Sequence, residues 1–201
     1  TAAAVTVNLA LNQASGFTSV TNIENVTGGT GGDSITGNAL ANALLGGGGN
    51  DTLNGGLGND TLNGGGGTDT ASYAGETDDF FISLLAGNAR RGAADAAIED
   101  TLVSIENVIG GAGNDTITSN GGSQTLDGGA GNDTLSGGAA NDVVNGGSGN
   151  DTIAYTIGHG ADTVNGGTDI DTLNILGTAV NDTLDVIFNG TAITTFEGGT
   201  V

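Results

Sequence analysis

The chain of 201 residues contains no cysteine, no proline, no methionine and no tryptophan, and its aromatic residues are two tyrosines and five phenylalanines. The lack of cysteine excludes a disulfide framework and a thiolate metal site. So few bulky side chains leave little material for a conventional globular core, which favours a thin core repeated along an axis. We find no apolar run that could cross a bilayer and no signal peptide at the N-terminus.

Positive charge is almost absent. Arg90 and Arg91 are the two basic residues against 23 acidic ones, and the formal net charge is -21. Nucleic acids and anionic membrane surfaces repel such a chain, so we expect neither as a partner and no direct membrane insertion. An acidic, glycine-rich chain is usually disordered, but the acidic residues of this one recur at a fixed spacing.

The 41 glycines follow a nine-residue pattern, Gly-Gly-x-Gly-x-Asp-x-(Leu/Ile/Val)-x, in a first block (28–72) and again in a second (110–185). The clearest copies are Gly46–Asn54, Gly55–Asn63, Gly128–Ser136 and Gly146–Ala154. The sixth position carries Asp33, Asp51, Asp60, Asp69, Asp115, Asp133, Asp142 and Asp151. The eighth position is apolar throughout, at Ile35, Leu44, Leu53, Leu62, Ala71, Ile117, Leu126, Leu135, Val144, Ile153, Val164, Leu173 and Leu184.

Each nonapeptide predicts a six-residue loop and a three-residue strand. In Thr52-Leu53-Asn54 the alternation of a strand sends Leu53 inward and its neighbours outward. Glycines at positions one, two and four permit positive φ and close backbone approach, so the loop can turn sharply and aim carbonyl oxygens at one point, where the sixth-position Asp adds a carboxylate. Hard oxygen ligands suit calcium, and His159 stands alone without cysteine, so the pattern favours calcium over zinc.

One loop cannot supply the six to eight oxygens that calcium prefers, so neighbouring loops must share ions. If two nonapeptides form one coil, loops 18 residues apart stack at about 4.8 Å. This predicts edge rows of Asp33, Asp51 and Asp69; Asp60 and Asp78, with Asn42 as a weaker member; Asp115, Asp133, Asp151 and Asp171; and Asp142, Asp162 and Asp182, weakened by Gln124. Further candidate ligands lie in the loops, at Gly46, Gly48, Gly55, Gly128 and Ala130.

Stacked carboxylates repel one another by about 1 kcal/mol per pair even in water. The coil should therefore open without ions, and calcium binding and folding should be one event.

Outside the two blocks, we expect N-terminal capping strands (1–27), a connecting or capping segment (73–109) and C-terminal strands (186–201). Alternation from Val5 to Leu11 predicts a strand with one buried face. Residues 80–85 predict another, with a turn at Gly87-Asn88, and the alanine-rich 93–97 suggest a short helix. Two-residue insertions interrupt the second block at Tyr155-Thr156 and Ile175-Leu176.

The tetrad Ile-Glu-Asn-Val occurs at 23–26 and at 105–108, directly before or near the Gly-Gly of each block. Its Glu24 and Glu106 stand where later copies carry Asp. We expect a structural cap over the first coil, and a share in an end calcium site is the alternative.

Together these motifs resemble the RTX, or haemolysin-type, calcium-binding nonapeptide repeat. The resemblance implies an all-β fold, a right-handed parallel β-roll in which two RTX blocks are joined by a β-rich segment. It also implies multiple calcium ions and bacterial export by type I secretion, with folding outside the cell. The chain departs from the pattern where Asn42 and Gln124 replace Asp and where Ala140 and Asp169 replace the fourth-position glycine, which weakens the expectation of ions at those loops.

No catalytic constellation is visible. Cysteine is absent, no Gly-x-Ser-x-Gly turn occurs, and His159 lies inside a repeat loop, so we expect no enzyme activity. The chain starts at Thr1 and stops at Val201 inside a repeat, so we expect a segment of a larger protein that is secreted or on the cell surface.

Our first interpretation is a structural, adhesive or self-assembling scaffold, which associates end to end or with other surface components. The alternative is the C-terminal export and folding module of a type I secreted enzyme or pore-forming toxin. A third, weaker hypothesis is a calcium buffer or sensor of about 10⁻⁴ to 10⁻³ M affinity.

Overall fold

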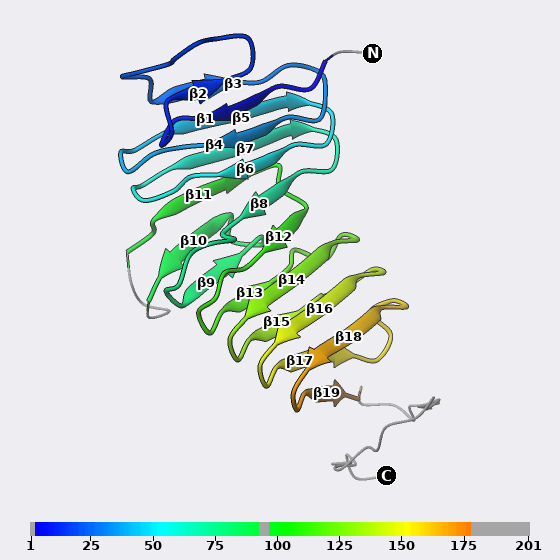
Figure 1. Cartoon of the computed structure of the whole chain (residues 1–201). Coiled ribbons are helices and arrows are strands. Elements are labelled where there is room, and N and C mark those ends of the chain that lie inside the picture. The colour runs from blue at the N-terminus through cyan, green and yellow to red at the C-terminus, as the bar shows by residue number, and fades with distance from the viewer. Residues whose placement is uncertain (1–2, 93–96, 178–201) are drawn as a thin grey trace.

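In a computed structural model, residues 3–92 and 97–177 are described, and their strands stack into a parallel β-solenoid (Figure 1). The prediction of an all-β roll is confirmed. The described residues contain no helix, and thus none that could cross a membrane. Residues 93–96 of the suggested helix lie outside the described residues, as do Asp182, Leu184 and the expected strands at 186–201.

The strands form two sheets of nine and ten members. Sheet A contains β18 (Thr163–Thr168), β16 (Val143–Ser148), β14 (Thr125–Ala130), β12 (Asn107–Ile109), β8 (Thr70–Ser72), β6 (Thr52–Asn54), β4 (Ser34–Thr36), β1 (Thr6–Asn8) and β2 (Gln13–Ala14), in that order. Sheet B contains β19 (Thr172–Leu176), β17 (Thr152–Thr156), β15 (Thr134–Ser136), β13 (Thr116–Thr118), β9 (Phe80–Ser83), β10 (Asn88–Arg91), β11 (Asp100–Val103), β7 (Thr61–Gly66), β5 (Ala43–Gly48) and β3 (Asn25–Thr27).

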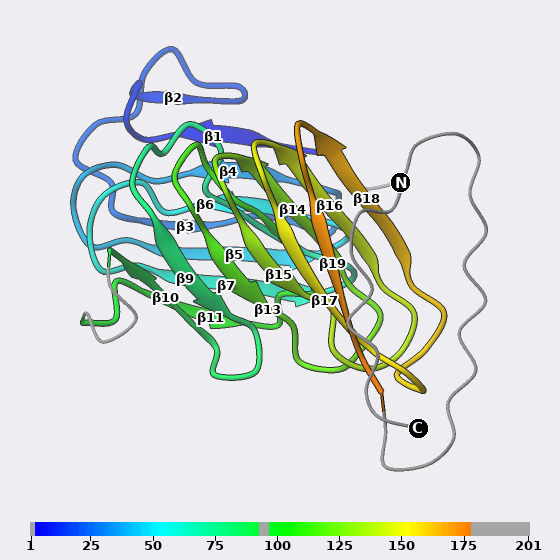
Figure 2. The same cartoon turned by 90° about the horizontal axis from the view of Figure 1, so that it is seen from below.

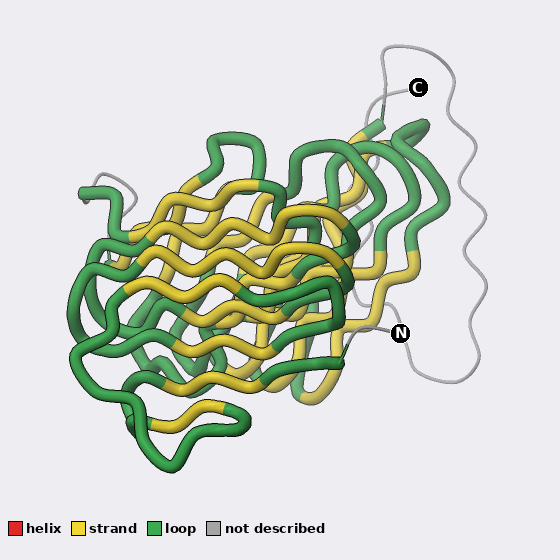
Figure 3. Tube along the Cα trace, turned by 90° about the horizontal axis from the view of Figure 1, so that it is seen from above, coloured by secondary structure: helices red, strands yellow, loops and turns green. Residues whose placement is uncertain are grey.

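Successive coils pair in the predicted register of two nonapeptides. In sheet A, Ile35 of β4 lies opposite Leu53 of β6, which lies opposite Ala71 of β8, and both pairings are parallel. In sheet B, Ile117 lies opposite Leu135 in the same way. The six-residue loops therefore gather along the two edges of the strand stack (Figure 3).

The eighth-position side chains form the core between the sheets. The following residues are at most 2% exposed: Ile35, Leu44, Leu53, Leu62, Ala71, Ile117, Leu126, Leu135, Val144 and Ile153. Because each nonapeptide contributes one such residue, the core is one side chain deep and as long as the stack. Burying each leucine or isoleucine contributes about 2 kcal/mol of stability. Val164 is half-buried and Leu173 is 48% exposed, because they belong to the last described coil.

The connecting segment does not interrupt the solenoid. Strands β9, β10 and β11 all join sheet B, with β10 antiparallel to both neighbours, whereas sheet A passes directly from β8 to β12. Sheet B thus gains two strands, about 10 Å, that sheet A lacks. These two extra strands on one side account for the angle between the strands of the two blocks in Figure 2.

The predicted strand at Val5–Leu11 is shorter in the structure. Strand β1 ends at Asn8; Leu9 is buried, while Leu11 is 63% exposed in the loop that leads to β2. The predicted strand at residues 80–85 is present as β9 but ends at Ser83, and Asn88 of the expected turn already begins β10, which pairs antiparallel with β9. The two insertions of the second block lie side by side, since Tyr155 pairs with Ile175 and Thr156 with Leu176.

Candidate calcium sites

The sixth-position residues line both edges of the solenoid, in two rows. Within a row, the backbone N–H of most members donates to the carboxylate of the next coil, as from Asp33 N to Asp51 Oδ1 at 2.7 Å and from Asp51 N to Asp69 Oδ1 at 2.8 Å. Glu106 N is an exception and donates to the Asp69 carbonyl at 3.1 Å. Row A precedes the strands of sheet A and contains Asp33, Asp51, Asp69, Glu106, Gln124, Asp142 and Asp162. Row B precedes the strands of sheet B and contains Asn42, Asp60 and Asp100, then Asp115, Asp133, Asp151 and Asp171.

The second carboxylate oxygen of the inner row members is buried without a partner. Among the described residues, Oδ2 lacks any hydrogen bond in Asp51, Asp60, Asp69, Asp133, Asp142 and Asp151. A buried carboxylate oxygen without a donor is strongly unfavourable unless a cation faces it. These six oxygens therefore fit a hard cation between the loops.

First-position glycines leave the space that these oxygens face. A Cβ at Gly46 would lie 2.2 Å from Asp51 Oδ2 and 2.7 Å from the carbonyl oxygen of Gly64, one coil further on. At Gly128 the corresponding distances are 2.3 Å to Asp133 Oδ2 and 2.5 Å to Gly146 O. A carboxylate oxygen and a carbonyl oxygen of adjacent coils thus flank one point, where any side chain would block them.

In the clearest copies positive φ occurs at the second and fourth positions of the loop; in the loop that begins at Ser119 it occurs at the third, at Gly121 (φ 92°). Gly47 and Gly49 have φ of 111° and 106°, whereas Gly46 is not among the residues of positive φ. The expectation that position one needs glycine for its φ is therefore wrong, because space is the reason there. Alanine and aspartate occupy the strained fourth position at Ala140 (φ 70°) and Asp169 (φ 79°), the two departures noted in the sequence.

The other predicted loop residues lie at the same edges. A Cβ at Gly55 would meet Asp60 Oδ2 at 2.2 Å. Gly48 and Ala130 end strands β5 and β14, and their N–H groups donate to the carbonyls of Gly29 and Gly111 at 2.9 Å.

At Asp33, Asn42 and Asp115, the first row members of their blocks on these edges, a side-chain oxygen accepts a hydrogen bond from the backbone of its own loop instead. Asp33 Oδ2 accepts from Gly29 N at 2.6 Å, and Asp115 Oδ2 accepts from Gly111 N at 2.8 Å. Asn42 Oδ1 accepts from Asn38 N at 2.8 Å. The backbone satisfies these oxygens, so these loops need no cation to satisfy them.

The prediction that Asp78 continues the row of Asp60 is wrong. Asp60 N donates to Asp100 Oδ1 at 3.1 Å, and Asp100 is 1% exposed, whereas Asp78 lies on an exposed turn and pairs with Arg91. A signal for Asp100 was present, since Asp100-Thr101-Leu102 repeats the Asp-Thr-Leu of the clearest copies. The glycine loop that should precede it is missing, and the nine-residue frame therefore missed it.

Glu106 is a row member. Its Oε2 accepts from Asp69 N at 2.8 Å. Only Ser104–Glu106 separate β11 from β12, and Ser104 has φ of 49°. Because this loop is three residues shorter than the repeat loop, the longer glutamate side chain reaches the position of an aspartate. Glu24 precedes β3 and its carbonyl accepts from Ala43 N at 3.2 Å.

The pKa values of the row carboxyl groups also favour a cation beside them. Burial raises the pKa of Asp133 to about 7; a hydrogen bond from Asp115 N opposes the rise, and the charges of Asp115 and Asp151 add to it. Burial likewise raises the pKa of the other orphaned row members, Asp51, Asp60, Asp69, Asp142 and Asp151. Burial in the fold therefore disfavours the ionised form of these carboxyl groups.

No group of three or more acidic, histidine or cysteine side chains in the described part of the chain could hold a metal unaided. Each site has one carboxylate per loop, so most ligands must be backbone carbonyls, which suits calcium and not zinc. His159 Nδ1 lies 3.1 Å from Gly138 O in an exposed loop, as its place in the repeat predicted.

The family model for the RTX calcium-binding nonapeptide repeat matches four copies, at residues 36–71, 104–123, 118–153 and 158–174, which together cover more than half of the chain. The chain belongs to the RTX family. No curated protein matches it as a relative. RTX nonapeptides bind Ca²⁺, and several repeats imply several ions. The RTX β-roll is a structural calcium-binding module typical of secreted bacterial proteins.

Proposed function

We propose that this RTX chain is a non-enzymatic, calcium-dependent β-roll segment of a secreted bacterial protein, acting outside the cell or on its surface as a structural or adhesive scaffold. The observation that carries the proposal is the set of six buried, unpartnered Oδ2 atoms in two edge rows. Calcium would supply the positive charge that allows these carboxylates to be ionised and stacked.

The proposed ligands follow from the positions of the oxygens. In each site the sixth-position Oδ2 and the first-position carbonyl of the next coil would bind the ion, as at Asp51 with Gly64 and at Asp133 with Gly146. At Asp69 the carbonyl of Ser104 takes the place of that glycine, since both oxygens face Gly64. Asp162 and Asp171 accept from Asp142 N and Asp151 N and would extend the rows.

A scaffold role is supported by the surface of the roll. The outward strand positions carry mainly threonine, serine and asparagine, as at Thr116, Thr134 and Thr152 on sheet B, so charge is concentrated on the edges. Among the described strands, β2 and β3 at one end and β18 and β19 at the other pair on one side only. The unpaired backbone N–H and C=O groups of an open strand edge can bond to a strand of another molecule, which supports end-to-end self-association.

Calorimetric titration with calcium and circular dichroism with and without EDTA test the binding. We expect several ions with affinities of about 10⁻⁴ to 10⁻³ M and loss of the β spectrum on chelation. A spectrum that ignores both calcium and EDTA would refute the proposal.

Sedimentation velocity separates the scaffold from an export and folding module of an enzyme or toxin. Both require calcium-triggered folding, but a scaffold that associates end to end should form larger species as calcium and protein concentrations rise. A monomer under all conditions would remove the self-association and favour the export module.

A further inference from the structure

The connecting segment contains a repeat loop that is hidden in the sequence. Three hydrogen bonds place residues 76–80 where a preceding coil would lie: Phe80 N donates to Asp115 Oδ1 at 2.8 Å, Asn114 N to Asp79 Oδ1 at 2.7 Å, and Ala112 N to Glu76 O at 2.7 Å. The same bonds join the regular coils, as from Asp115 N to Asp133 Oδ1, Asn132 N to Asn114 Oδ1, and Ala130 N to Gly111 O.

Phe80 thus occupies the sixth position of this hidden loop, where an aspartate would otherwise face a calcium ion. The inserted pair Tyr73-Ala74 shifts the frame by two residues, and this shift explains why Asp78 misses the row. The Phe80 ring is fully buried, with its centroid 4.6 Å from that of Tyr73, and the Arg91 guanidinium carbon lies 4.7 Å from the Phe80 centroid.

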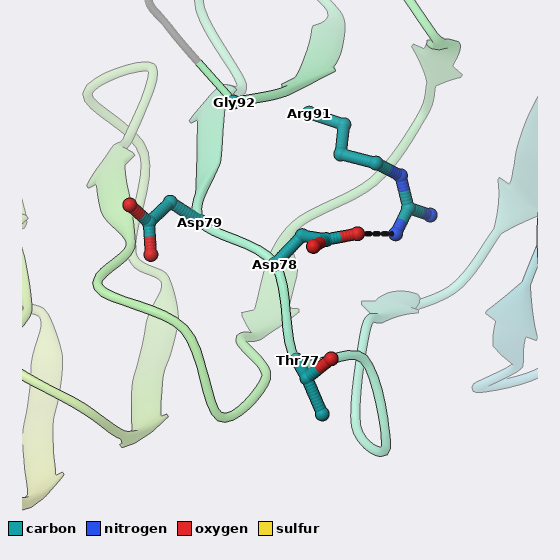
Figure 4. Close-up of a pocket in the computed structure, with 5 residues that line it drawn as sticks. All are labelled: Thr77, Asp78, Asp79, Arg91 and Gly92. Carbon is teal, nitrogen blue, oxygen red and sulfur yellow. Dashed lines mark hydrogen bonds and ion pairs between the residues drawn. The ribbon is translucent and has the colours of Figure 1, made fainter.

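Arg91 lies between the row-B loop that precedes Asp100 and the hidden loop, both within the connecting segment. Its Nη1 contacts Asp78 at 2.7 Å (Figure 4) and Glu76 at 2.9 Å, both from the hidden loop, while its Nε contacts Glu99, next to Asp100, at 3.0 Å. Three carboxylates from two successive loops therefore converge on one guanidinium. Asp79 points away from Arg91 in Figure 4.

Asp100, the row-B member that follows Asp60, has its second carboxylate oxygen satisfied by an uncharged group. Asp100 Oδ2, the counterpart of the orphaned oxygens, accepts from the Tyr73 hydroxyl at 3.0 Å. On the other side of the junction, Asp115 Oδ2 already accepts from Gly111 N. No orphaned aspartate oxygen occurs among the described residues from 73 to 115.

The geometry points to a calcium-independent folding unit at the junction, in which the Arg91 guanidinium takes the role that calcium has in the repeat coils. This unit comprises residues 73–92 and 97–115, and it divides the orphaned sites into Asp51, Asp60 and Asp69 on one side and Asp133, Asp142 and Asp151 on the other. It rests on the proposed function only for the identity of the ion in the two blocks. The two blocks are thus expected to bind calcium and fold as separate cooperative units on a common preformed junction.

Hydrogen exchange of the full chain, resolved by peptide and measured in EDTA and in excess calcium, tests the unit. In EDTA, amides of β9, β10 and β11 should exchange at least about tenfold more slowly than those of β6 and β15. Arg91→Met, which keeps an apolar stem over Phe80 but removes the charge, should abolish that difference. Arg90→Met changes the net charge equally from the neighbouring position and should preserve it. Uniform exchange of junction and blocks in wild-type EDTA samples would overturn the proposal, as would equal loss in both arginine variants.

A second measurement tests whether the two blocks bind calcium and fold independently. Asp133→Asn should raise the calcium concentration needed to protect β13–β17 severalfold and leave that for β4–β8 unchanged. A parallel shift in both blocks would overturn the division. If calcium protects neither block, the proposed function fails, while a protected junction in EDTA still supports the calcium-independent unit.

Discussion

Replacing Asp133 by asparagine should change stability in opposite directions with and without calcium. Asp133 lies in the middle of row B, 1% exposed, with Oδ1 bonded to Asp115 N and Oδ2 unpartnered. Asparagine keeps the shape and one acceptor oxygen, but it removes the charge. Without calcium the variant should therefore be the more stable protein, and with calcium the less stable one.

The size of the effect follows from the pKa of the carboxyl group. Burial raises the pKa of Asp133 to about 7, against about 3.9 when unfolded. Ionising it in the fold costs roughly 2 to 4 kcal/mol, where the lower value allows for solvent screening near the loop surface. The neutral amide of the Asp133→Asn variant would avoid this cost in EDTA. At about 10 mM calcium, losing one site of 10⁻⁴ to 10⁻³ M affinity should destabilise the variant by roughly 1 to 3 kcal/mol.

Urea denaturation in calcium at pH 7.5 measures the loss, and the β circular dichroism signal that remains in EDTA at the same pH measures the gain. Asp127→Asn is the matched control, since Asp127 lies on the outer face of β14 in the same block and bonds Asn145 Nδ2 at 3.2 Å. It should change stability by no more than about 0.5 kcal/mol under either condition. If Asp133→Asn destabilises the chain equally in EDTA and in calcium, the carboxylate is only a hydrogen-bond acceptor and the reasoning is refuted.

Three further predictions concern pH and the loop glycines. The raised pKa values mean that the calcium-free fold binds more protons than the unfolded chain, so in EDTA stability should fall as pH rises from about 4 through 7, whereas with calcium bound it should rise. The β circular dichroism signal that remains in EDTA, and urea midpoints in calcium, each at pH 5 and 7.5, will show whether the two trends differ in sign. Ala140→Gly should stabilise the chain by about 1 kcal/mol, because Ala140 has φ of 70°, which glycine adopts without strain. The control Ala139→Gly should not stabilise it, and equal thermal midpoints for the two variants would contradict this. Gly128→Ala should weaken calcium binding at least about tenfold by filling the space beside Asp133 Oδ2, while Gly66→Ala, which has no atom within 4 Å of its Cβ, should bind normally in calorimetry.

Much of the fold follows from local periodicity. A residue such as Leu53 sits at a fixed place in a nine-residue unit, and strand alternation alone sends it inward. Because each coil contacts mainly its neighbours, the same local rule predicts the 18-residue register and the rows through Asp51 and Asp133. These parts of the site needed no knowledge of distant contacts.

The junction could not be predicted in this way. Phe80, Arg91 and Glu99 belong to strands and turns that meet only because β9 and β10 are inserted between β11 and β13 in sheet B. The two-residue insertion at Tyr73-Ala74 moved the frame, so Asp78 was assigned a place that Asp100 holds.

The sequence by itself determined the repeating unit, the identity of the core face and the need for cations, because each depends on residues close together in the chain. Only the tertiary structure decided which loops retain an unpartnered oxygen and which close on Gly29, Tyr73 or a neighbouring backbone amide. That choice depends on what the adjacent coil offers, and the adjacent coil is set by strand pairing across tens of residues.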